Sequence, residues 1–323
     1  MGGRVSAPWL SVVMPTYNGS AFLRAALDSV CAQPLAEVEI VAVDDGSDDD
    51  TLAILEAYSS RLPLRVVRRP RTGNWVASTN HGLRIARGEY ACLLHQDDLW
   101  LGGRLRAVRG ALEGTPEAGL VVHPSWFIDA RGTRLGRWRC PLPPGKVAPA
   151  LVLERLIVQN FLAVPAPTFR RELALSLGGM DESLWYTADW DLWLKLSRAA
   201  AILHHPEPLA AFRVHADSQT ATESSRDRDL RFQLETVLRR HLGAAAGADR
   251  RLASIAEFSV ELNLALAARL HRRPAPWSSL GARFLALGPA GWKRYLRDSR
   301  IAERVGARLR LLRERHRAGV AAS

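Results

Sequence analysis

The run Val38–Ser47, VEIVAVDDGS, decides the fold that we expect of this chain of 323 residues. Its mostly apolar first half predicts a buried strand, and the strand ends where Asp44 and Asp45 begin the polar part. Ser47 and the acidic residues after it are typical of a helix N-terminus, and the apolar residues beyond them recur at helical spacing. A strand that leads into a helix in this way predicts one unit of an α/β sheet.

The same alternation of strand and helix surrounds this unit. Apolar runs predict strands at 10–14, 38–43, 64–67 and 90–94, and helical periodicity predicts helices at 22–30, 52–57 and 75–87. We therefore expect an α/β fold with a mostly parallel, Rossmann-like sheet that is flanked by helices. Ligands of such sheets bind beyond the carboxyl ends of the strands, so the polar residues that follow each strand are the candidates for function.

The alternation weakens after residue 105. A strand at 119–127, a Gly- and Pro-rich loop at 131–146 and helices at 151–162 and 190–198 are predicted there, and from residue 226 onward helix follows helix. The pattern divides the chain into residues 1–105, residues 106–222 and a mainly helical C-terminal extension, residues 223–323.

Composition excludes several classes of protein. With 47% apolar and 24% charged residues, the chain is globular and neither fibrous nor disordered. No apolar run approaches the roughly 18 residues of a membrane-spanning helix, and we expect no signal peptide before the first strand. Cys31, Cys92 and Cys140 lie far apart without a CxxC pair, which argues against a disulfide framework or a structural zinc site. These features predict a protein of the reducing cytoplasm.

The net charge of +11 belongs to the C-terminal extension. Residues 226–323 hold 21 Lys and Arg against 9 Asp and Glu, whereas residues 1–225 hold 23 against 24. Arginines there alternate with Trp, Phe, Tyr and Leu, as in basic amphipathic helices that lie on an anionic membrane surface. The alternatives are a solvated, Arg-rich helical face and a nonspecific contact with nucleic acid. No recognition-helix, RNP or KH pattern indicates specific nucleic-acid binding.

Pairs of carboxylates follow two of the predicted strands. Asp44 and Asp45, at a strand–helix turn, can accept hydrogen bonds from a ribose or base beside an electropositive helix N-terminus. Asp97 and Asp98 repel one another unless a cation holds them, and Mg²⁺ or Mn²⁺ suits one or two carboxylates together with phosphate oxygens. Both pairs also fit ordinary helix caps, so neither pair alone decides the function.

A third acidic cluster opens the helix predicted at 190–198. Asp189 and Asp191 point roughly 200° apart on a helix, so only one of them can face a shared cleft while the other caps the helix or points to solvent. A carboxylate walled by tryptophans should have a raised pKa and can serve as a general base. A capped, buried helix is the alternative.

Together these segments resemble the family 2 glycosyltransferases of the GT-A type. Order and spacing match over residues 10–110, and later segments agree, so the resemblance covers about residues 8–220 and leaves out the C-terminal extension. The matching segments are Val12–Asn18, Val43–Thr51, Gly88–Tyr90, Gln96–Trp100, Gly178–Glu182, Asp189–Trp193 and Phe212–His215.

The resemblance implies an inverting transfer of a sugar from a nucleotide-diphosphate sugar to an acceptor hydroxyl. It implies that residues 1–105 bind the donor and that residues 106–222 bind a saccharide or lipid-linked acceptor. The usual setting of the family is the assembly of surface polysaccharide or glycolipid, which here implies a peripheral position at the inner face of the cell membrane.

The resemblance also implies a role for individual residues. Asp98 would ligate Mn²⁺ or Mg²⁺ on the diphosphate, and Asp189 would be the catalytic base. The other residues that it implies are the nucleotide contacts Thr16, Tyr17, Asn18, Asp45 and Asp97 and the acceptor or diphosphate contacts Trp190, Asp191, Arg213 and His215.

Two positions depart from the family pattern. His95 stands where relatives often have the first acid of Asp-x-Asp-Asp, and Ala188 stands where they commonly have a Glu before the base. A relative that binds donor without turnover is therefore one alternative, and the retained aspartates weigh against it. A nucleotidyltransferase is disfavoured because Thr16–Gly19 replaces the Gly-rich basic loop expected after its first strand.

Overall fold

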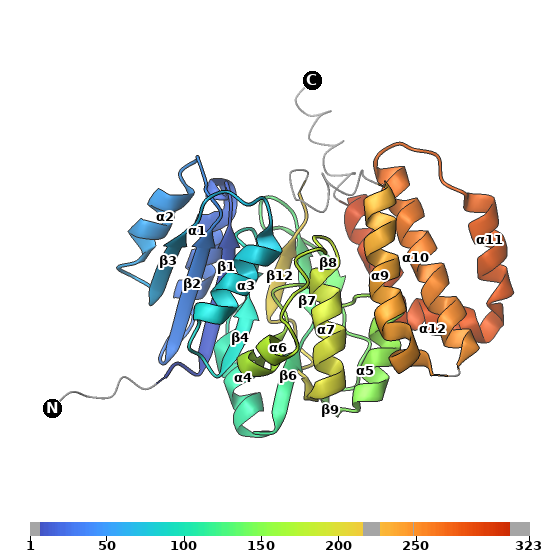
Figure 1. The fold of residues 1–323 in the computed structure, drawn as a ribbon, viewed down its shortest axis with the longest axis horizontal. Helices are drawn as coiled ribbons and strands as arrows, with labels where there is room; N and C mark the ends of the chain where they lie inside the picture. The colour runs from blue at the N-terminus through green and yellow to red at the C-terminus, as the bar shows by residue number, and fades with distance from the viewer. Residues whose placement is uncertain (1–6, 216–226, 248, 311–323) are drawn as a thin grey trace.

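The computed structural model describes residues 7–215, 227–247 and 249–310. Two sheets form the middle of the fold, helices pack on both faces of the larger sheet, and the C-terminal helices stand together at one end of the molecule (Figure 1). The predicted α/β fold, with a mostly parallel sheet and a mainly helical C-terminal region, is confirmed.

The larger sheet has eight strands in the order β3-β2-β1-β4-β10-β6-β11-β9. Strands β3, β2, β1 and β4 are parallel, β11 is parallel to β6, and β10 and β9 are antiparallel to their neighbours. Because β1 lies between β2 and β4, the loops that follow these three strands meet at one edge of the sheet. The strands are β1 (Leu10–Thr16), β2 (Val38–Asp44), β3 (Leu64–Arg68), β4 (Tyr90–Leu93), β6 (Ala118–Val122), β9 (Gly145–Val147), β10 (Thr168–Arg170) and β11 (Ala201–His204).

Both faces of this sheet are apolar because successive side chains of a strand point to opposite sides. Val13 of β1 belongs to one hydrophobic core, and its neighbours Val12 and Met14 belong to the other. The core with Val12 is closed by α1 (Ser20–Cys31), α2 (Thr51–Tyr58) and α4 (Arg104–Glu113). The core with Val13 is closed by α3 (Trp75–Ile85), α5 (Pro149–Leu156), α6 (Arg171–Ser176) and α7 (Ala188–Ala199).

A smaller sheet, which the sequence did not predict, has the strand order β5-β12-β7-β8. Its strands are β5 (Leu99–Trp100), β7 (Ser125–Ile128), β8 (Arg134–Trp138) and β12 (Ala210–Arg213). The single strand predicted at 119–127 is therefore wrong, since β6 and β7 belong to different sheets. The predicted loop at 131–146 contains β8, and the helix predicted at 151–162 ends at Leu156. The strands of this sheet come from distant parts of the chain, as in the pairing of Ala211 with Leu99, and local periodicity does not report such partners.

The C-terminal region consists of α9 (Asp227–Ala246), α10 (Arg250–Leu270), α11 (Trp277–Ala286), α12 (Gly288–Ser299) and a helical segment at 301–310. Leu234 and Val237 of α9 belong to the same core as residues of α5 and α7. The extension is therefore packed onto the α/β part through a shared core. Within the described residues, no helix combines the length and the apolar character that a membrane crossing requires.

Candidate functional site

Thr16 and Asp44 end the neighbouring strands β1 and β2 and lie opposite one another in the parallel register. The Thr16 hydroxyl donates to Oδ1 of Asp44 at 3.2 Å, and the backbone N–H of Asp45 donates to the Thr16 carbonyl at 2.9 Å. Oδ2 of Asp44 accepts the backbone N–H of Ser47 at 3.0 Å, so this carboxylate holds the turn after β2. The predicted nucleotide contacts Thr16 and Asp45 therefore lie side by side at the carboxyl edge of the sheet.

The buried carboxylate of Asp45 is held by the loop at residues 71–73. Its Oδ1 accepts the backbone N–H and the hydroxyl of Thr72 at 2.9 and 2.7 Å. Its Oδ2 accepts Nη1 of Arg71 at 2.7 Å and the backbone N–H of Gly73 at 2.8 Å. Burial alone would raise the pKa of Asp45, but these hydrogen bonds hold the pKa below its ordinary value. Since a carboxylate offers about four acceptor positions, a direct contact with a base requires this loop to move.

Tyr17 and Asn18 follow β1 and stay exposed. The guanidinium of Arg71 lies 3.3 Å from the centroid of the Tyr17 ring, a cation–π contact. Tyr17 also exchanges two hydrogen bonds of 2.9 Å between its backbone and the side-chain amide of Gln96. Asn18 has a φ of 44° and donates its backbone N–H to Oγ of Ser47 at 3.0 Å. The loop after β1 is thus fastened to the loops after β2 and β4.

Asp97 and Asp98 lie between β4 and β5, and β12 brings Arg213 and His215 against them. The backbone N–H of Arg213 donates to Oδ1 of Asp98 at 2.9 Å, and its Nε donates to the Asp97 carbonyl at 2.7 Å. Its Nη1 donates to two carbonyls of the loop after β7 at 2.8 and 3.0 Å, so this guanidinium is largely used by the fold. Nε2 of His215 lies 3.1 Å from Oδ2 of Asp97. The structure therefore brings together the Asp97–Asp98 pair and the Arg213–His215 segment, which lie more than a hundred residues apart in the sequence.

Oδ2 of Asp98 is buried and has no hydrogen-bond partner among the described residues. Burial, followed by the neighbouring charge of Asp97, raises the pKa of Asp98 well above its ordinary value. Two adjacent carboxylates with an unpaired buried oxygen are a donor set that suits Mg²⁺ or Mn²⁺ beside phosphate oxygens. Over residues 7–215, 227–247 and 249–310, no three His, Cys, Asp or Glu side chains are grouped to hold a metal by themselves. The residues therefore fit a cation that takes most of its ligands from a bound phosphate and from water.

Asp189 lies in the first turn of α7 with 8% of its surface exposed. Its Oδ2 accepts Nδ2 of Asn160 at 2.9 Å, and Oδ1 of Asn160 accepts the backbone N–H of Leu162 at 3.1 Å, which fixes the amide. Burial raises the pKa of Asp189 to about 6, against the opposing effects of hydrogen bonds from the Trp190 backbone and Asn160 and of the Arg304 charge. A carboxyl group with this pKa is suited to accept a proton near neutral pH.

Trp75 joins the strand-end cluster to the segment that carries Asp189. Its ring packs edge-on against the ring of His95, with 4.9 Å between centroids. Its indole N–H donates to the carbonyl of Trp185 at 2.8 Å. His95 leads into the paired carboxylates, and Trp185 leads into α7, so the two candidate sites are connected through one side chain.

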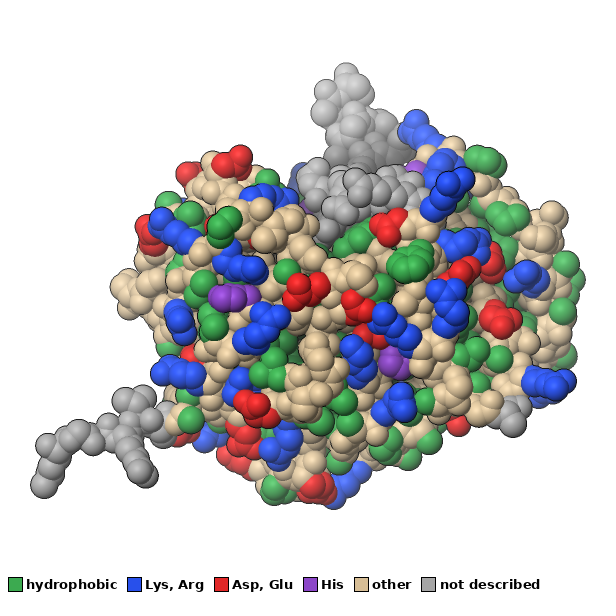
Figure 2. Space-filling view, viewed as in Figure 1, with side chains coloured by type: hydrophobic (Ala, Val, Ile, Leu, Met, Phe, Trp, Pro, Cys, Tyr) green, Lys and Arg blue, Asp and Glu red, His purple; other side chains and the backbone are tan. Residues whose placement is uncertain are grey.

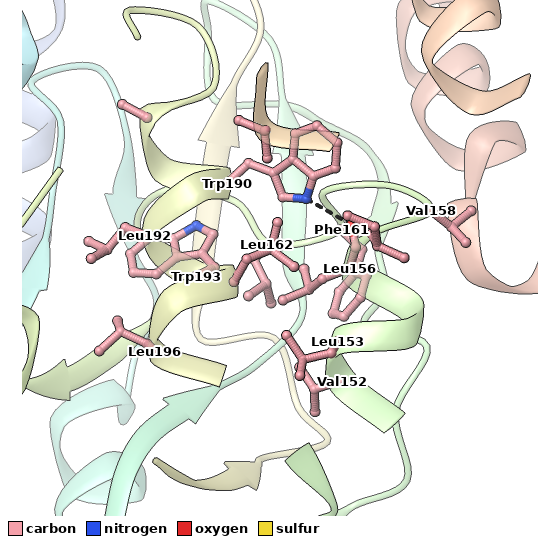
Figure 3. Close-up of a cluster of buried hydrophobic side chains, with 14 of the residues drawn as sticks. Val152, Leu153, Leu156, Val158, Phe161, Leu162, Trp190, Leu192, Trp193 and Leu196 are labelled. Carbon is pink, nitrogen blue, oxygen red and sulfur yellow. Dashed lines mark hydrogen bonds between the residues drawn. The ribbon is translucent and has the colours of Figure 1, made fainter. Parts of the chain in front are cut away.

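Trp190 and Asp191 point into the interior of the protein. The Trp190 indole N–H donates to the Leu156 carbonyl at 2.8 Å, and its ring lies among buried apolar side chains (Figure 3). Asp191 is fully buried, with Oδ1 2.9 Å from Nε2 of His241 and Oδ2 2.6 Å from Nζ of Lys195. Burial would raise the pKa of Asp191, but these partners lower it to about 2. Asp191 thus faces α9, neither capping the helix nor pointing to solvent, and an acceptor contact by either residue stays a prediction that needs a different conformation.

Three residues that bear on these sites were missed by the sequence analysis: Arg71, Asn160 and Arg304. Arg71 lies in an arginine-rich connection without periodicity, and Arg304 lies outside the segments that resemble a known family. Asn160 carried the one usable signal, because Gln159 and Asn160 are two adjacent amides within the otherwise apolar run from residue 156 to 164. Polar residues inside an apolar run indicate buried hydrogen bonds.

The two candidate sites differ in chemistry. The carboxylates at Asp97 and Asp98 suit a cation and the phosphate oxygens that it binds, whereas the carboxyl group of Asp189 suits acceptance of a proton from a hydroxyl. Both abilities together serve a substitution in which a phosphate-type leaving group departs as a hydroxyl attacks.

Comparison with known proteins finds one matching family and several relatives. Residues 11–155 match the family model described as Glycosyl transferase family 2. Over 230 residues the chain is 28% identical to an uncharacterized glycosyltransferase of Rickettsia prowazekii (strain Madrid E), and the match covers 69% of each chain.

Two solved structures share the fold of this chain. TarS residues 1–349 from S. aureus, in complex with UDP-GlcNAc, superposes with a TM-score of 0.60 and 17% identity, covering 90% of this chain and 92% of that chain. The mannosyltransferase PcManGT from Pyrobaculum calidifontis, in complex with GDP-Man and Mn²⁺, superposes with a TM-score of 0.56 and 19% identity, covering 95% of this chain and 88% of that chain. At these identities the likeness concerns the fold.

Proposed function

Because the chain belongs to glycosyl transferase family 2 and is a glycosyltransferase, we propose that it moves a sugar from a nucleotide-diphosphate donor to an acceptor hydroxyl with inversion. The observation that carries the proposal is the unpaired, buried Oδ2 of Asp98 beside Asp97. Complexes of the two structural neighbours with UDP-GlcNAc and with GDP-Man and Mn²⁺ support a nucleotide-sugar donor and a divalent cation.

On the donor side, the loops after β1, β2 and β4 form the binding edge. Asp98, with Asp97 beside it, would hold Mn²⁺ or Mg²⁺, which when bound neutralises negative charge on the departing diphosphate. Tyr17 and Asn18 are exposed at this edge and offer a ring and an amide to a base or ribose. Thr16 and Asp45 hold the backbone of this edge in place through the hydrogen bonds described above.

On the acceptor side, Asp189 takes the proton of the attacking hydroxyl. Asn160 orients Oδ2 of Asp189, so the carboxylate is held in place for the acceptor hydroxyl. The attack from the face opposite the leaving group gives inversion at the anomeric carbon. The pKa of about 6 leaves Asp189 mostly ionised at neutral pH and still basic enough to take the proton as it is released.

Calorimetry tests the donor site directly. We expect the full chain to bind one of UDP, GDP, CDP or dTDP in the presence of Mn²⁺ and to lose that binding in Asp98→Asn. The matched control is Asp28→Asn, which makes the same change at an exposed position on α1. If no nucleotide binds with any metal, or if Asp98→Asn binds as tightly as the natural chain, the donor site is not where we propose it.

Product analysis tests the stereochemistry. Once the nucleotide is known, its sugar conjugates are incubated with candidate saccharide acceptors, and the anomeric configuration of the product is read by proton NMR. Inversion relative to the donor supports an attack assisted by Asp189, and retention contradicts it.

We further propose that α11 and α12 rest on an anionic membrane surface, as suits work on a lipid-linked acceptor in polysaccharide or glycolipid assembly. Trp277 and Leu285 of α11 and Leu296 of α12 are 46%, 66% and 53% exposed. Exposed basic residues of these helices and the turn before them are Arg272, Arg283, Lys293 and Arg297. Lys and Arg side chains lie beside hydrophobic ones over the C-terminal helices in the view of Figure 2. Exposed apolar and cationic side chains together favour an interface with anionic lipid over bulk water.

Sedimentation with vesicles tests the membrane proposal. The chain should pellet with phosphatidylglycerol vesicles at low salt, release at high salt, and stay free of phosphatidylcholine vesicles. Replacing Trp277 and Leu285 by Ser should weaken the binding without changing the melting temperature. Equal pelleting with both lipids, or none with either, contradicts the proposal.

A further inference from the structure

Arg304 is a largely buried cation with one guanidinium nitrogen that no described residue pairs. It lies in the helical segment at 301–310, with its guanidinium carbon 5.5 Å from the centroid of the Trp138 ring. Its Nη1 is sealed from solvent and lacks a hydrogen-bond partner among the residues that the structure describes. Burial lowers the pKa of Arg304, because little water reaches this position to solvate the positive charge.

The nearby carboxylates are engaged elsewhere. Glu303 pairs with Arg139 at 2.8 Å, and Asp189 accepts its side-chain hydrogen bond from Asn160. Within the described ranges, neither Arg304 nor Arg308 takes part in an ion pair. A buried guanidinium without an acceptor costs folding free energy, so a bound anion would stabilise this position.

Arg308 lies one helical turn beyond Arg304 and adds a second positive charge on the same side of the segment. The charges of Arg308, Tyr186 and Asp189 all act on Arg304. Tyr186 precedes α7, whose first turn carries Asp189. The positive charge of Arg304 therefore acts on the base, and Arg308 adds its charge next to Arg304.

The charge of this pair selects the anion. Two guanidinium groups match the charge of a phosphate monoester, which is close to −1.5 to −2 at neutral pH, roughly twice that of a carboxylate. Guanidinium forks also bind phosphate oxygens two at a time.

We propose that Arg304 and Arg308 form an anion subsite beside Asp189 that binds a phosphate ester of the acceptor. The proposal rests on the acceptor side of the proposed function, since it takes Asp189 as the base. It gives the C-terminal extension a direct part in acceptor choice: the extension selects phosphate-bearing acceptors, either soluble or lipid-linked.

The test is binding of inorganic phosphate to the full chain, measured by calorimetry with EDTA present so that the donor site holds no cation. We expect Arg304→Gln to weaken phosphate binding about ten-fold or more, as the loss of charge-assisted hydrogen bonds implies, and Arg304→Lys to restore part of it. Arg106→Gln removes the same charge at an exposed position on α4 and should bind phosphate like the natural chain. Arg308→Gln is the second variant, in case Arg304→Gln does not fold.

A parallel arm distinguishes the two sources of phosphate. Phosphatidylcholine vesicles with and without phosphatidic acid are sedimented with the natural chain and with Arg304→Gln. If Arg304→Gln weakens the binding of inorganic phosphate, the result supports a soluble acceptor. If Arg304→Gln weakens only the binding to vesicles with phosphatidic acid, the result supports a lipid-linked acceptor. If neither ligand depends on Arg304 or Arg308, the proposal is overturned. Nucleotide binding with Mn²⁺ in the same variants reports separately on the donor site.

Discussion

Nδ2 of Asn160 donates a hydrogen bond of 2.9 Å to Oδ2 of Asp189. The two residues come from different parts of the chain, the loop after α5 and the first turn of α7. The bond fixes one oxygen of the carboxylate and favours its ionised form, while burial opposes ionisation. The balance of these two effects sets the pH at which Asp189 can act as a base.

Replacing Asn160 by Ala should move the pH dependence of catalysis. The lost hydrogen bond stabilised the ionised carboxylate, so the pKa of Asp189 rises above its value of about 6 in the natural chain. The acidic limb of kcat/KM against pH should move to higher pH, with the plateau at high pH less affected. The control Asn263→Ala removes an amide of α10 that binds Gln159 and should leave the limb in place. An unchanged limb in Asn160→Ala would mean that another group controls it.

Asp189→Asn should separate stability from activity. The folded-state pKa of about 6 lies above the ordinary 3.8, so the folded protein binds the proton more tightly than the unfolded chain does. The protonated Asp189 favours the folded state. This contribution to the free energy of unfolding is fully present below pH 3.8 and is lost as the pH rises through about 6. Above that pH the neutral Asn avoids a penalty of at most about 3 kcal/mol, less whatever the amide loses in its contact with Asn160.

Urea denaturation at several pH values and turnover at pH 8 (roughly two units above the Asp189 pKa) check this prediction. Asp189→Asn should be equal to or more stable than the natural chain above pH 7, while turnover falls about 10²-fold or more. Nucleotide binding should stay unchanged. A variant with normal turnover would remove Asp189 from the role of base.

Asp45→Asn should destabilise the donor edge. An amide has one oxygen where the carboxylate has two, and its NH₂ group would face the donors of Arg71 and Gly73. With buried donors left unpaired, we expect a loss of about 2–4 kcal/mol in the free energy of unfolding, measured by urea denaturation. Asp48→Asn, three residues further along and exposed, should cost almost nothing. Equal stability of the two variants would show that the loop at 71–73 does not depend on this carboxylate.

The parallel half of the fold could be predicted because its information is local. The strand from Val38 to Asp44 is mostly apolar on both faces, and the polar residues that mark its end follow directly in the sequence. The smaller sheet could not be predicted, since Leu99 of β5 pairs with Ala211 of β12 across more than a hundred residues. The candidate site divides in the same way: Asp98 and Asp189 stand in recognisable segments, whereas Arg304 reaches the site only through tertiary packing. Burial of Trp190 stayed one of two alternatives, because periodicity does not tell which neighbour covers a helix face.

Asp191 is expected to anchor the C-terminal region rather than to touch substrate. Its carboxylate is fully buried on α7, and its partner His241 lies on α9, with 2.9 Å between Nε2 and Oδ1. In Asp191→Asn the positive charge of Lys195 loses its buried counterion, so we expect a loss of about 3–5 kcal/mol in the free energy of unfolding. Glu235→Gln, which breaks partly exposed ion pairs on α9, should cost less than about 1 kcal/mol.

The pH dependence identifies the origin of the loss in Asp191→Asn. The pKa of Asp191 is lowered to about 2, below the ordinary 3.8, so its stabilising effect is present above pH 3.8 and disappears as the pH falls through about 2. The difference in unfolding free energy between the natural chain and Asp191→Asn should therefore narrow between pH 4 and pH 2, near the two pKa values of about 3.8 and about 2. A difference that stays constant over this range would mean that the variant fails through packing, and the charge of Asp191 would then contribute little to holding the C-terminal region in place.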